Sequence, residues 1–559
     1  MKPRREPGLT RRAFVAAPFA PFTLAACGAR DAVDGDEGLE ALDGGWVGAD
    51  PARGHRLRDL DAASLPPPGR RRRCDVLIVG AGIAGLAAAR ALERAGVHDV
   101  QLLELEDAPG GNSRAHAIAG MACPLGAHYL PLPGPDAHEV AELLHELGLA
   151  RHELGRTVYD ERHLCHAPQE RLWIDGQWLD GLLPPAERGS ARLAQYRRFA
   201  RLVDDASKAA RFAMPTARAP WTAAHAALDA GTFAQWLARH GLDDEGLRWY
   251  LDYCCRDDYG AGLAQVSAWA GLHYFASRHG FHAPGDDAAA EREAVLTWPE
   301  GNAWIAQRLA QPLRDRLHAA RVALRVEAAR HEVQVDAWSA ADDRLERWSA
   351  RHAVLAVPLH AAVRAWTAPP AALRAAAAAV PHAPWLVTNL HLSEPLTDKP
   401  GAPPAWDNVL YGSEALGYVD AMHQSLRPHP GPTVITAYWA LPPAARAALL
   451  AQPWQAWARR VIDDLARAHP DLPRKLRRVD LARYGHAMAV PAPGVRGHAA
   501  LAALRDGAAG ARVHLAHADL SGYSVFEEAY HHGLRAGERV AAALRSTTQP
   551  PPKPALRPT

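Results

Sequence analysis

The stretch that decides the fold is Asp75-Val-Leu-Ile-Val-Gly-Ala-Gly-Ile-Ala-Gly-Leu-Ala-Ala-Ala-Arg-Ala-Leu-Glu-Arg-Ala-Gly96. Residues 75–79 form a short apolar run rich in branched side chains, which predicts a buried parallel strand. Three glycines follow within six residues. Residues 84–95 are rich in alanine and stop at a glycine, which predicts a helix. This order of strand, glycine turn and helix is typical of an α/β protein.

The same stretch predicts that a dinucleotide binds here. Gly80 permits a tight turn, Gly82 lets the backbone approach a pyrophosphate, and Gly85 lets the helix lie close to the strand. The N-terminus of the helix offers N–H groups to phosphates. Residues 100–103 predict a second strand, and Glu104 at its end can accept hydrogen bonds from ribose hydroxyls. Because the glycines have this context on both sides, they predict a binding site and not merely a turn.

The residues after this unit resemble the start of the flavin-containing amine oxidase and phytoene desaturase superfamily, which implies FAD as the cofactor. The resemblance rests on Glu104, the pair Gly110-Gly111, and Arg114. The family often has arginine directly after the second glycine, but that place holds Asn112 here. This resemblance implies a mixed α/β fold, in which a Rossmann-type FAD-binding domain is interleaved with a substrate domain of mixed sheet plus helices. Further contacts to FAD implied in this part are Ile83, Ala84 and Leu105.

Three later segments extend the resemblance to about residues 75–540. The segment 118–133 resembles the one that runs under the flavin, and in it His128 or Tyr129 either meets the substrate or simply packs. Residues 350–358 resemble a strand that ends in Ala-Val-Pro, and Val326 takes the place where backbone packs against adenine. Residues 513–538 resemble the last strand, acidic residue and helix. The FAD contacts implied here are Gly126, Ala127, His128, Tyr129, Val326, Ala356, Asp519, Val525, Phe526 and Ala529.

Four residues are predicted near the reacting atoms. Tyr523 resembles the residue that gives one wall of an aromatic cage, and His486 is the best candidate for a polar group that faces the substrate, or else a structural histidine. Asn389, or else Thr388, takes the place of the lysine that usually holds a water near the flavin in the family. In some relatives the loop 483–494 carries a cysteine bonded to the flavin; no cysteine occurs here, so we expect FAD to be non-covalent. His128 is the fourth candidate.

An acidic group in an apolar surround, within residues 253–260, admits two interpretations. Arg256, Asp257 and Asp258 interrupt the apolar run, and charges there need partners. They form either a polar corner of the substrate cavity or an ion-paired helix junction.

The N-terminus predicts export. Residues 10–15 match a twin-arginine pattern, and residues 24–27 match a bacterial lipobox that makes Cys27 a lipid attachment site. The alternative is simple cleavage near Ala26. We therefore expect a periplasmic protein that is anchored to the cell envelope through the lipid on Cys27.

The domain organisation expected from these segments has eight parts. A signal and a linker or arm come first, three FAD-binding parts alternate with two substrate parts, and a disordered tail ends the chain. Their bounds are 1–27, 28–73, 74–135 (FAD), 136–295 (substrate, helical), 296–365 (FAD), 366–490 (substrate, sheet), 491–545 (FAD) and 546–559.

The expected function is oxidation of an amine by hydride transfer to flavin N5, with dioxygen or another acceptor taking the electrons. The missing lysine keeps two alternatives open: a flavin-dependent desaturase or isomerase of an apolar, isoprenoid-like substrate, and a non-catalytic FAD-containing envelope protein. A net charge of +1 gives no indication of nucleic-acid binding. The 29 histidines show no metal-ligand spacing, so no metal site is predicted.

Overall fold

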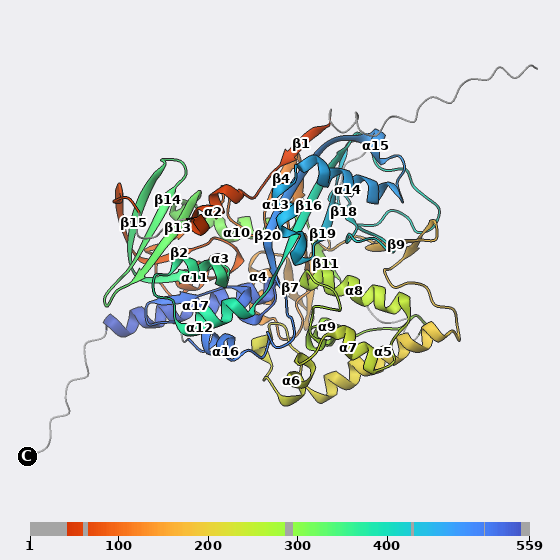
Figure 1. Ribbon diagram of the computed structural model, residues 1–559, viewed down its shortest axis with the longest axis horizontal. Helices are drawn as coiled ribbons and strands as arrows, with labels where there is room; N and C mark the ends of the chain where they lie inside the picture. Colours follow the sequence, from red (N-terminus) through yellow and green to blue (C-terminus); the bar gives the residue numbers. More distant parts are fainter. Residues whose placement is uncertain (1–41, 60–64, 286–293, 426–429, 508, 549–559) are drawn as a thin grey trace, which may run out of the picture. The chain divides into compact units, whose positions relative to one another are not determined.

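Two large β-sheets organise the chain in the computed structural model (Figure 1). The structure describes residues 42–59, 65–285, 294–425, 430–507 and 509–548. The predictions for the export signal, Cys27 and most of the C-terminal tail lie outside these ranges.

The seven-stranded sheet is built around the strand predicted from the opening stretch. β2 and β3 run parallel, β15 lies on the other side of β2, and β21 adds to β15. In order, the strands are β12 (Leu317–His318), β3 (Val100–Leu103), β2 (Arg70–Val79), β15 (Arg344–Leu355), β14 (Val333–Ser339) and β13 (Arg321–Ala328), with β21 (Val513–Leu515) paired to β15.

Helices cover both faces of this sheet because alternate residues of β2 point to opposite sides. Val76 and Ile78 pack in one core cluster, whereas Leu77 and Val79 pack in another. The first cluster includes α3 (Ile83–Arg94), α4 (His138–Glu146), α10 (Ala303–Ala310) and α17 (Phe526–Thr548). The second includes α11 (Leu359–Ala365), α12 (Ala371–Ala379) and α16 (Ala499–Arg505).

The close approach of α17 to α3 depends on two glycines. A Cβ on Gly533 would lie 2.2 Å from the carbonyl oxygen of Ala84, and one on Gly537 would lie 2.5 Å from that of Ala88. The C-terminal helix α17 therefore packs directly on α3, the helix of the first βαβ unit.

The eight-stranded sheet forms the second half of the structure. Its core strand β16 pairs antiparallel with β19 and β20. In order, the strands are β1 (Asp43–Trp46), β20 (Leu476–Ala489), β16 (His382–Leu392), β19 (Thr433–Ala440), β18 (Tyr418–Asp420), β17 (Asp407–Leu410), β9 (Glu170–Ile174) and β10 (Gln177–Asp180).

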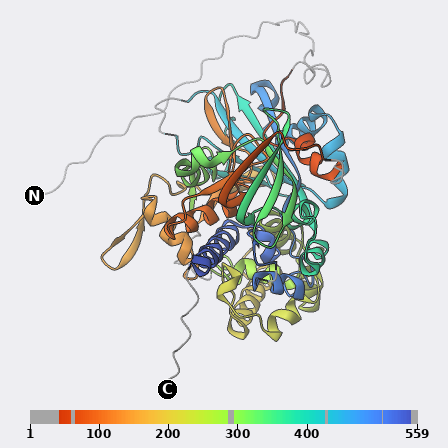
Figure 2. The ribbon, with the colours of Figure 1, turned by 90° about the vertical axis from the view of Figure 1, so that its left-hand side faces the viewer.

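Helices also cover this second sheet. One face shares a core cluster with α5 (Ala191–Ala209), α7 (Phe233–Arg239), α8 (Glu245–Tyr259) and α9 (Ala268–Ala276). The amphipathic helix α14 (Trp454–Ala466) contacts β1 and β20. The hairpin of β7 (Ala150–Glu153) and β8 (Arg156–Tyr159) projects on the left of Figure 2, and Leu154 at its tip is almost fully exposed.

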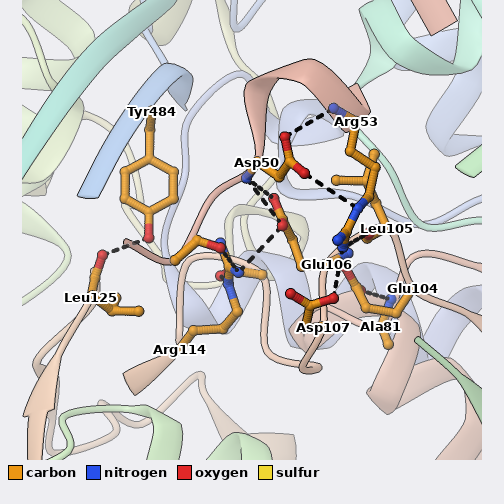
Figure 3. Close-up of polar contacts among 12 residues, drawn as sticks. Asp50, Arg53, Ala81, Glu104, Leu105, Glu106, Asp107, Arg114, Leu125 and Tyr484 are labelled. Carbon is orange, nitrogen blue, oxygen red and sulfur yellow. Dashed lines mark hydrogen bonds and ion pairs between the residues drawn. The ribbon is translucent and has the colours of Figure 1, made fainter. Parts of the chain in front are cut away.

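The arm before β2 packs against both sheets. β1 pairs in parallel with β20, and α2 (Pro51–Asp59) contacts β13 and α11. Figure 3 shows how Asp50 and Arg53 hold α2 in place: the Asp50 N–H donates to Glu106, and Arg53 donates to the carbonyl of Leu105 at 2.9 Å and to Asp107 at 3.0 Å. We name residues 42–59 the arm.

Three elements differ in extent from the sequence-based expectations. β2 begins at Arg70 and not at Asp75, so the basic run 70–73 belongs to a paired strand, and Arg70, Arg71 and Arg73 on it are exposed to solvent. α8 continues to Tyr259, so the acidic group lies within a helix. β20 runs to Ala489, because it pairs with β16 along most of its length, and this strand includes much of the loop predicted over 483–494.

The five cysteines among the described residues are free thiols. No described helix is long and apolar enough to cross a membrane.

Candidate functional site

A cavity of about 510 Å³ lies between the two sheets. The glycine turn after β2 and the ends of β3 and β15 form one part of its wall, and β16, β19, β20, α8 and the start of α17 form another. The segment 126–131, which ends in the short strand β6 (Tyr129–Pro131), runs between these parts. Segments that are far apart in the sequence therefore meet at one site.

Two glycines of the opening stretch, Gly80 and Gly85, are required by this packing. Gly80 has a φ of +98°, and a Cβ there would lie 2.3 Å from the carbonyl oxygen of Ala356. A Cβ on Gly85 would lie 1.9 Å from the carbonyl oxygen of Gly80, which is the close helix–strand contact predicted for it. Gly110 donates its N–H to the carbonyl of Ala81 at 2.8 Å, so the second glycine pair lies directly against the turn. The result is a backbone cradle that fits a dinucleotide pyrophosphate.

Glu104 lies in the cavity wall at the end of β3. Its carboxylate accepts hydrogen bonds from the N–H groups of Ala81 at 2.8 Å and of Glu106 at 2.9 Å (Figure 3). Burial raises the pKa of Glu104, and these two hydrogen bonds act against that rise. The hydrogen bonds fix the carboxylate next to the glycine turn, where a ribose would reach it.

Most of the predicted cofactor residues line this cavity. They are Gly80, Gly82, Ile83, Ala84, Glu104, Leu105, Gly110, Gly111, Asn112, Gly126, Ala127, His128, Tyr129, Ala356, Asp519, Val525, Phe526 and Ala529.

Three predicted cofactor residues lie outside the lining. Gly85 packs beneath the turn, as described above. Arg114 is buried and donates to the carbonyls of Gly111 at 2.9 Å and Gly48 at 3.0 Å, so it braces the glycine pair and the arm (Figure 3). Val326 is fully buried in the core of β13. The residues of that strand that reach the cavity are Arg321, Val322 and Ala323.

The family model for flavin containing amine oxidoreductases matches residues 83–541. The chain belongs to this family. FAD is the cofactor of the family. The residues of this chain that fit FAD are the glycine cradle and Glu104, which line the cavity.

Relatives of this amine oxidoreductase are found among curated proteins. AofH of Mycobacterium tuberculosis, named as a flavin-containing monoamine oxidase, is 37% identical over 167 residues, which are 29% of this chain and 32% of AofH. Putrescine oxidase of Kocuria rosea is 34% identical over 179 residues, 31% of this chain and 32% of that protein. Each alignment thus spans about a third of the relative's length.

Solved structures share the fold over nearly their full length. Cyclohexylamine oxidase from Brevibacterium oxydans has a TM-score of 0.62 at 21% identity and covers 86% of this chain and 100% of its own. Putrescine oxidase bound to putrescine has a TM-score of 0.60 at 18% identity, with coverages of 85% and 100%. A fatty acid isomerase from P. acnes has a TM-score of 0.59 at 17% identity, with coverages of 83% and 98%. At these identities the likeness establishes the fold alone.

One face of the eight-stranded sheet gives this amine oxidoreductase an aromatic cavity wall. Trp385 on β16, Tyr438 on β19 and Tyr484 on β20 all line the cavity. His128 stacks on Tyr438 with ring centroids 4.2 Å apart and planes inclined by 25°. Burial lowers the pKa of His128 to about 3, so its imidazole is neutral at pH 7. Tyr129 meets the His128 ring edge-on at 5.0 Å.

A group of histidines borders the cavity near Asp519. His486 lines the cavity as predicted, and its ring lies 4.7 Å from that of His360. Burial and the neighbouring Arg446 lower the pKa of His486 to about 4. Burial alone would raise the pKa of Asp519, but His517 and His382, each 3.1 Å from a carboxylate oxygen, hold it well below its usual range. Asp519 also accepts the N–H of Leu359, which begins α11.

The structure does not place two predicted catalytic residues at the cavity. Tyr523 is fully buried, and its hydroxyl donates to Glu528 at 2.9 Å and lies 3.1 Å from His273. Asn389 shares the face of β16 that carries Trp385, but it lies beyond the cavity. Its amide donates to the carbonyl of Pro124 at 3.1 Å, and its carbonyl accepts from Thr436 at 2.7 Å. Both side chains have protein partners, and neither lies where it would touch a bound substrate.

Several residues of the cavity wall were not predicted from the sequence. Trp385, Tyr438 and Tyr484 follow the alternation of their strands, but only the pairing of β16 with β19 and β20 shows that these faces coincide. Leu57 of the arm also lines the cavity. Nothing in its local sequence indicates that role.

Within the described ranges, no group of three or more His, Cys, Asp or Glu side chains is arranged to hold a metal ion.

Proposed function

We propose that this protein is an FAD-dependent oxidoreductase that oxidises an amine by hydride transfer from the carbon next to nitrogen to flavin N5. The observation that carries the proposal is the cavity itself, which extends from the glycine cradle to a wall of aromatic rings and neutral histidines. When bound there, the flavin supplies the two-electron acceptor. The chain supplies the binding and orientation of both reactants.

The neutral imidazoles suit an amine that must react as the free base. His128 and His486 both have strongly lowered pKa values, so at pH 7 each adds a hydrogen-bond donor and acceptor without adding positive charge. Tyr438 fixes His128 by stacking, and its own hydroxyl donates to the carbonyl of Gly126 at 3.1 Å. These contacts hold the aromatic wall rigid, which favours a single orientation of the substrate.

Two other functions have weaker support. A desaturase or isomerase of a hydrocarbon substrate would place an apolar chain against Asp257 and Glu527, both of which line the cavity, and burying carboxyl groups against hydrocarbon is costly. A purely structural FAD would not need an aromatic wall beyond the cradle. Amine oxidation uses both features.

The test is anaerobic bleaching of the purified flavoprotein's absorbance near 450 nm, a general property of oxidised flavin, with a panel of primary amines, followed by readmission of air. We expect amines to bleach the flavin. Recovery in air with hydrogen peroxide would identify dioxygen as the acceptor, whereas bleaching without recovery would identify another acceptor. Absence of bleaching with every amine would contradict the proposal.

We also propose that the protein is exported by the twin-arginine route and anchored in the envelope through Cys27, on the support of residues 10–15 and 24–27. Labelling of cells with a fatty acid tests this directly. We expect the label on the wild type and not on Cys27→Ala. Equal labelling of both, or of neither, would refute the anchor.

A further inference from the structure

The part of the cavity wall formed by α8 and α17 is rich in carboxyl groups. Asp257 and Asp258 of α8 line it, as does Glu527 in the first turn of α17. Arg278 lines the same part and donates to both oxygens of Asp258 at 3.0 and 3.1 Å. Because Arg278 balances the charge of Asp258, Asp257 and Glu527 remain as the two carboxyl groups of this part of the wall that face the cavity.

Asp257 is the better placed of the two to bind a cation. It is half-buried, and it accepts a hydrogen bond from the hydroxyl of Tyr129 at 3.2 Å. The adjacent Arg256 turns away, with contacts to Asp252 at 3.0 Å and to the carbonyl of Glu414 at 2.7 Å. Among the described side chains, no arginine or lysine forms an ion pair with Asp257. A carboxylate in such a site gains most from a charged partner, and the cavity is where that partner would come from.

That partner cannot be the reacting nitrogen. An amine needs its lone pair to release hydride from the neighbouring carbon, so the reacting nitrogen must be the neutral free base. A buried carboxylate does the opposite, since it stabilises the protonated ammonium form. Asp257 therefore suits a different nitrogen of the same molecule.

We propose that Asp257, with Glu527 in the same part of the wall, binds a second ammonium group of the substrate, so that this site selects diamines or longer polyamines over monoamines. The inference rests on the proposed amine oxidation. Tyr129 connects the two ends of such a substrate: its hydroxyl holds Asp257, and its ring meets His128 of the aromatic wall.

The experiment compares chain-matched amines on the full-length flavoprotein. Hexane-1,6-diamine is compared with hexylamine, and butane-1,4-diamine with butylamine, by the rate of anaerobic bleaching. For the wild type we expect half-saturation at about tenfold lower concentration for each diamine than for its monoamine. Asp257→Asn should raise the half-saturating concentration of the diamines by about 30-fold and leave the monoamines and the limiting rate within about twofold.

The matched control is Glu245→Gln, which removes a negative charge from the exposed start of the same helix. We expect it to behave as the wild type with all four amines. A second readout is the shift in thermal unfolding temperature caused by hexane-1,6-diamine, because this shift reports binding without turnover. The diamine should stabilise the wild type and Glu245→Gln, and should not stabilise Asp257→Asn.

The outcomes separate the two proposals. Bleaching by monoamines and diamines at equal concentrations, with no effect of Asp257→Asn, would overturn the second-ammonium site and leave amine oxidation intact. An equal fall in limiting rate for all amines in Asp257→Asn would also overturn it, because Asp257 would then act on the reacting nitrogen. No bleaching by any amine, together with an Asp257-dependent thermal shift, would keep the site and refute the oxidation. No bleaching and no shift would refute both.

Discussion

The two sheets contribute to the cavity in different ways. The seven-stranded sheet contributes mainly backbone: glycines with no room for a Cβ, and N–H groups that fix Glu104. The eight-stranded sheet contributes side chains, including Trp385 and Tyr438, whose positions depend on strand pairing. A backbone cradle tolerates almost no substitution, whereas a wall of side chains can change and so change the substrate. The following predictions test this contrast, beginning with the largest effect.

The first prediction concerns the cradle. Gly80→Ala places a Cβ 2.3 Å from the carbonyl oxygen of Ala356 at a φ of +98°, so the turn must move. We expect flavin retention, measured as the ratio of absorbance at about 450 to 280 nm, to fall at least about tenfold, with a stability loss of about 3 kcal/mol. Gly134→Ala, where a Cβ meets nothing within 4 Å, is the control and should retain the flavin. Full retention in Gly80→Ala would show that the cradle is less rigid than its geometry indicates.

The second prediction concerns the sheet beyond the cavity. Asn389→Lys puts a charge at a fully buried site where the asparagine now bonds to Pro124 and Thr436. We expect the free energy of unfolding to fall by about 3 kcal/mol, measured by chemical denaturation. Gln177→Lys, at an exposed position of the same sheet, should change it by less than about 0.5 kcal/mol. A stable Asn389→Lys variant with faster reoxidation in air would instead show that this position reaches the flavin.

The third prediction is a pH dependence at the acidic part of the wall. Burial raises the pKa of Asp257 and of Glu527 to about 7, so both ionise as the pH rises through neutrality. An aliphatic ammonium with a pKa of about 10 stays charged over this range. The half-saturating concentration of hexane-1,6-diamine should therefore fall about tenfold between about pH 6 and pH 8. The titratable or charged groups that interact with these two carboxyls include Tyr129, Tyr253, Cys254, Arg256, Asp258, Arg278, Asp407, Tyr438, Tyr523 and Glu528.

The control for this profile is hexylamine, since its one nitrogen reacts as the free base. Any pH dependence that both amines share belongs to the reacting nitrogen, and the ratio of the two removes it. A ratio that stays constant across this range would contradict the assignment of Asp257 and Glu527.

The fourth and smallest effect concerns the arm. Arg53→Ala removes the hydrogen bonds to the carbonyl of Leu105 and to Asp107, and so loosens the helix that brings Leu57 to the cavity. We expect FAD to dissociate about threefold faster, because partly exposed contacts of this kind are weak. The recovery of flavin fluorescence after dilution measures it. Arg58→Ala on the same helix, where the arginine pairs with its neighbour Asp59 and with no other residue that the structure describes, should leave the rate unchanged. Equal rates for both variants would show that α2 does not hold the cofactor.

The sequence predicted the first sheet and its cradle because that information is local. A run of thirty residues predicted the strand over 100–103 and the roles of Gly80 and Gly85. The structure has the strand at these residues and leaves no room for a Cβ at either glycine. The family and FAD followed from the same part of the chain.

The remainder of the site could not be predicted from local sequence because it depends on contacts between distant segments. The sequence predicts that Tyr523 is an aromatic residue of the cavity wall, but its hydroxyl donates a buried hydrogen bond to Glu528 instead. The acidic group combines features of both interpretations: Asp257 and Asp258 both line the cavity, and Asp258 is also ion-paired with Arg278. The period of a helix does not distinguish these neighbours, because their partners come from other elements.

The arm also bears on the order of folding. β1 pairs with β20 across a sequence separation of 435 residues between Asp43 and Arg478, so the first described strand has no partner until nearly the whole chain has been made. Contacts of such long range form late, because the entropy of closing the loop must be overcome first. The other strands of the eight-stranded sheet are paired independently of β1. The arm, although it precedes both sheets in the sequence, is therefore expected to dock late, as is α17 on α3, whose contact between Gly533 and Ala84 spans a still longer stretch of chain.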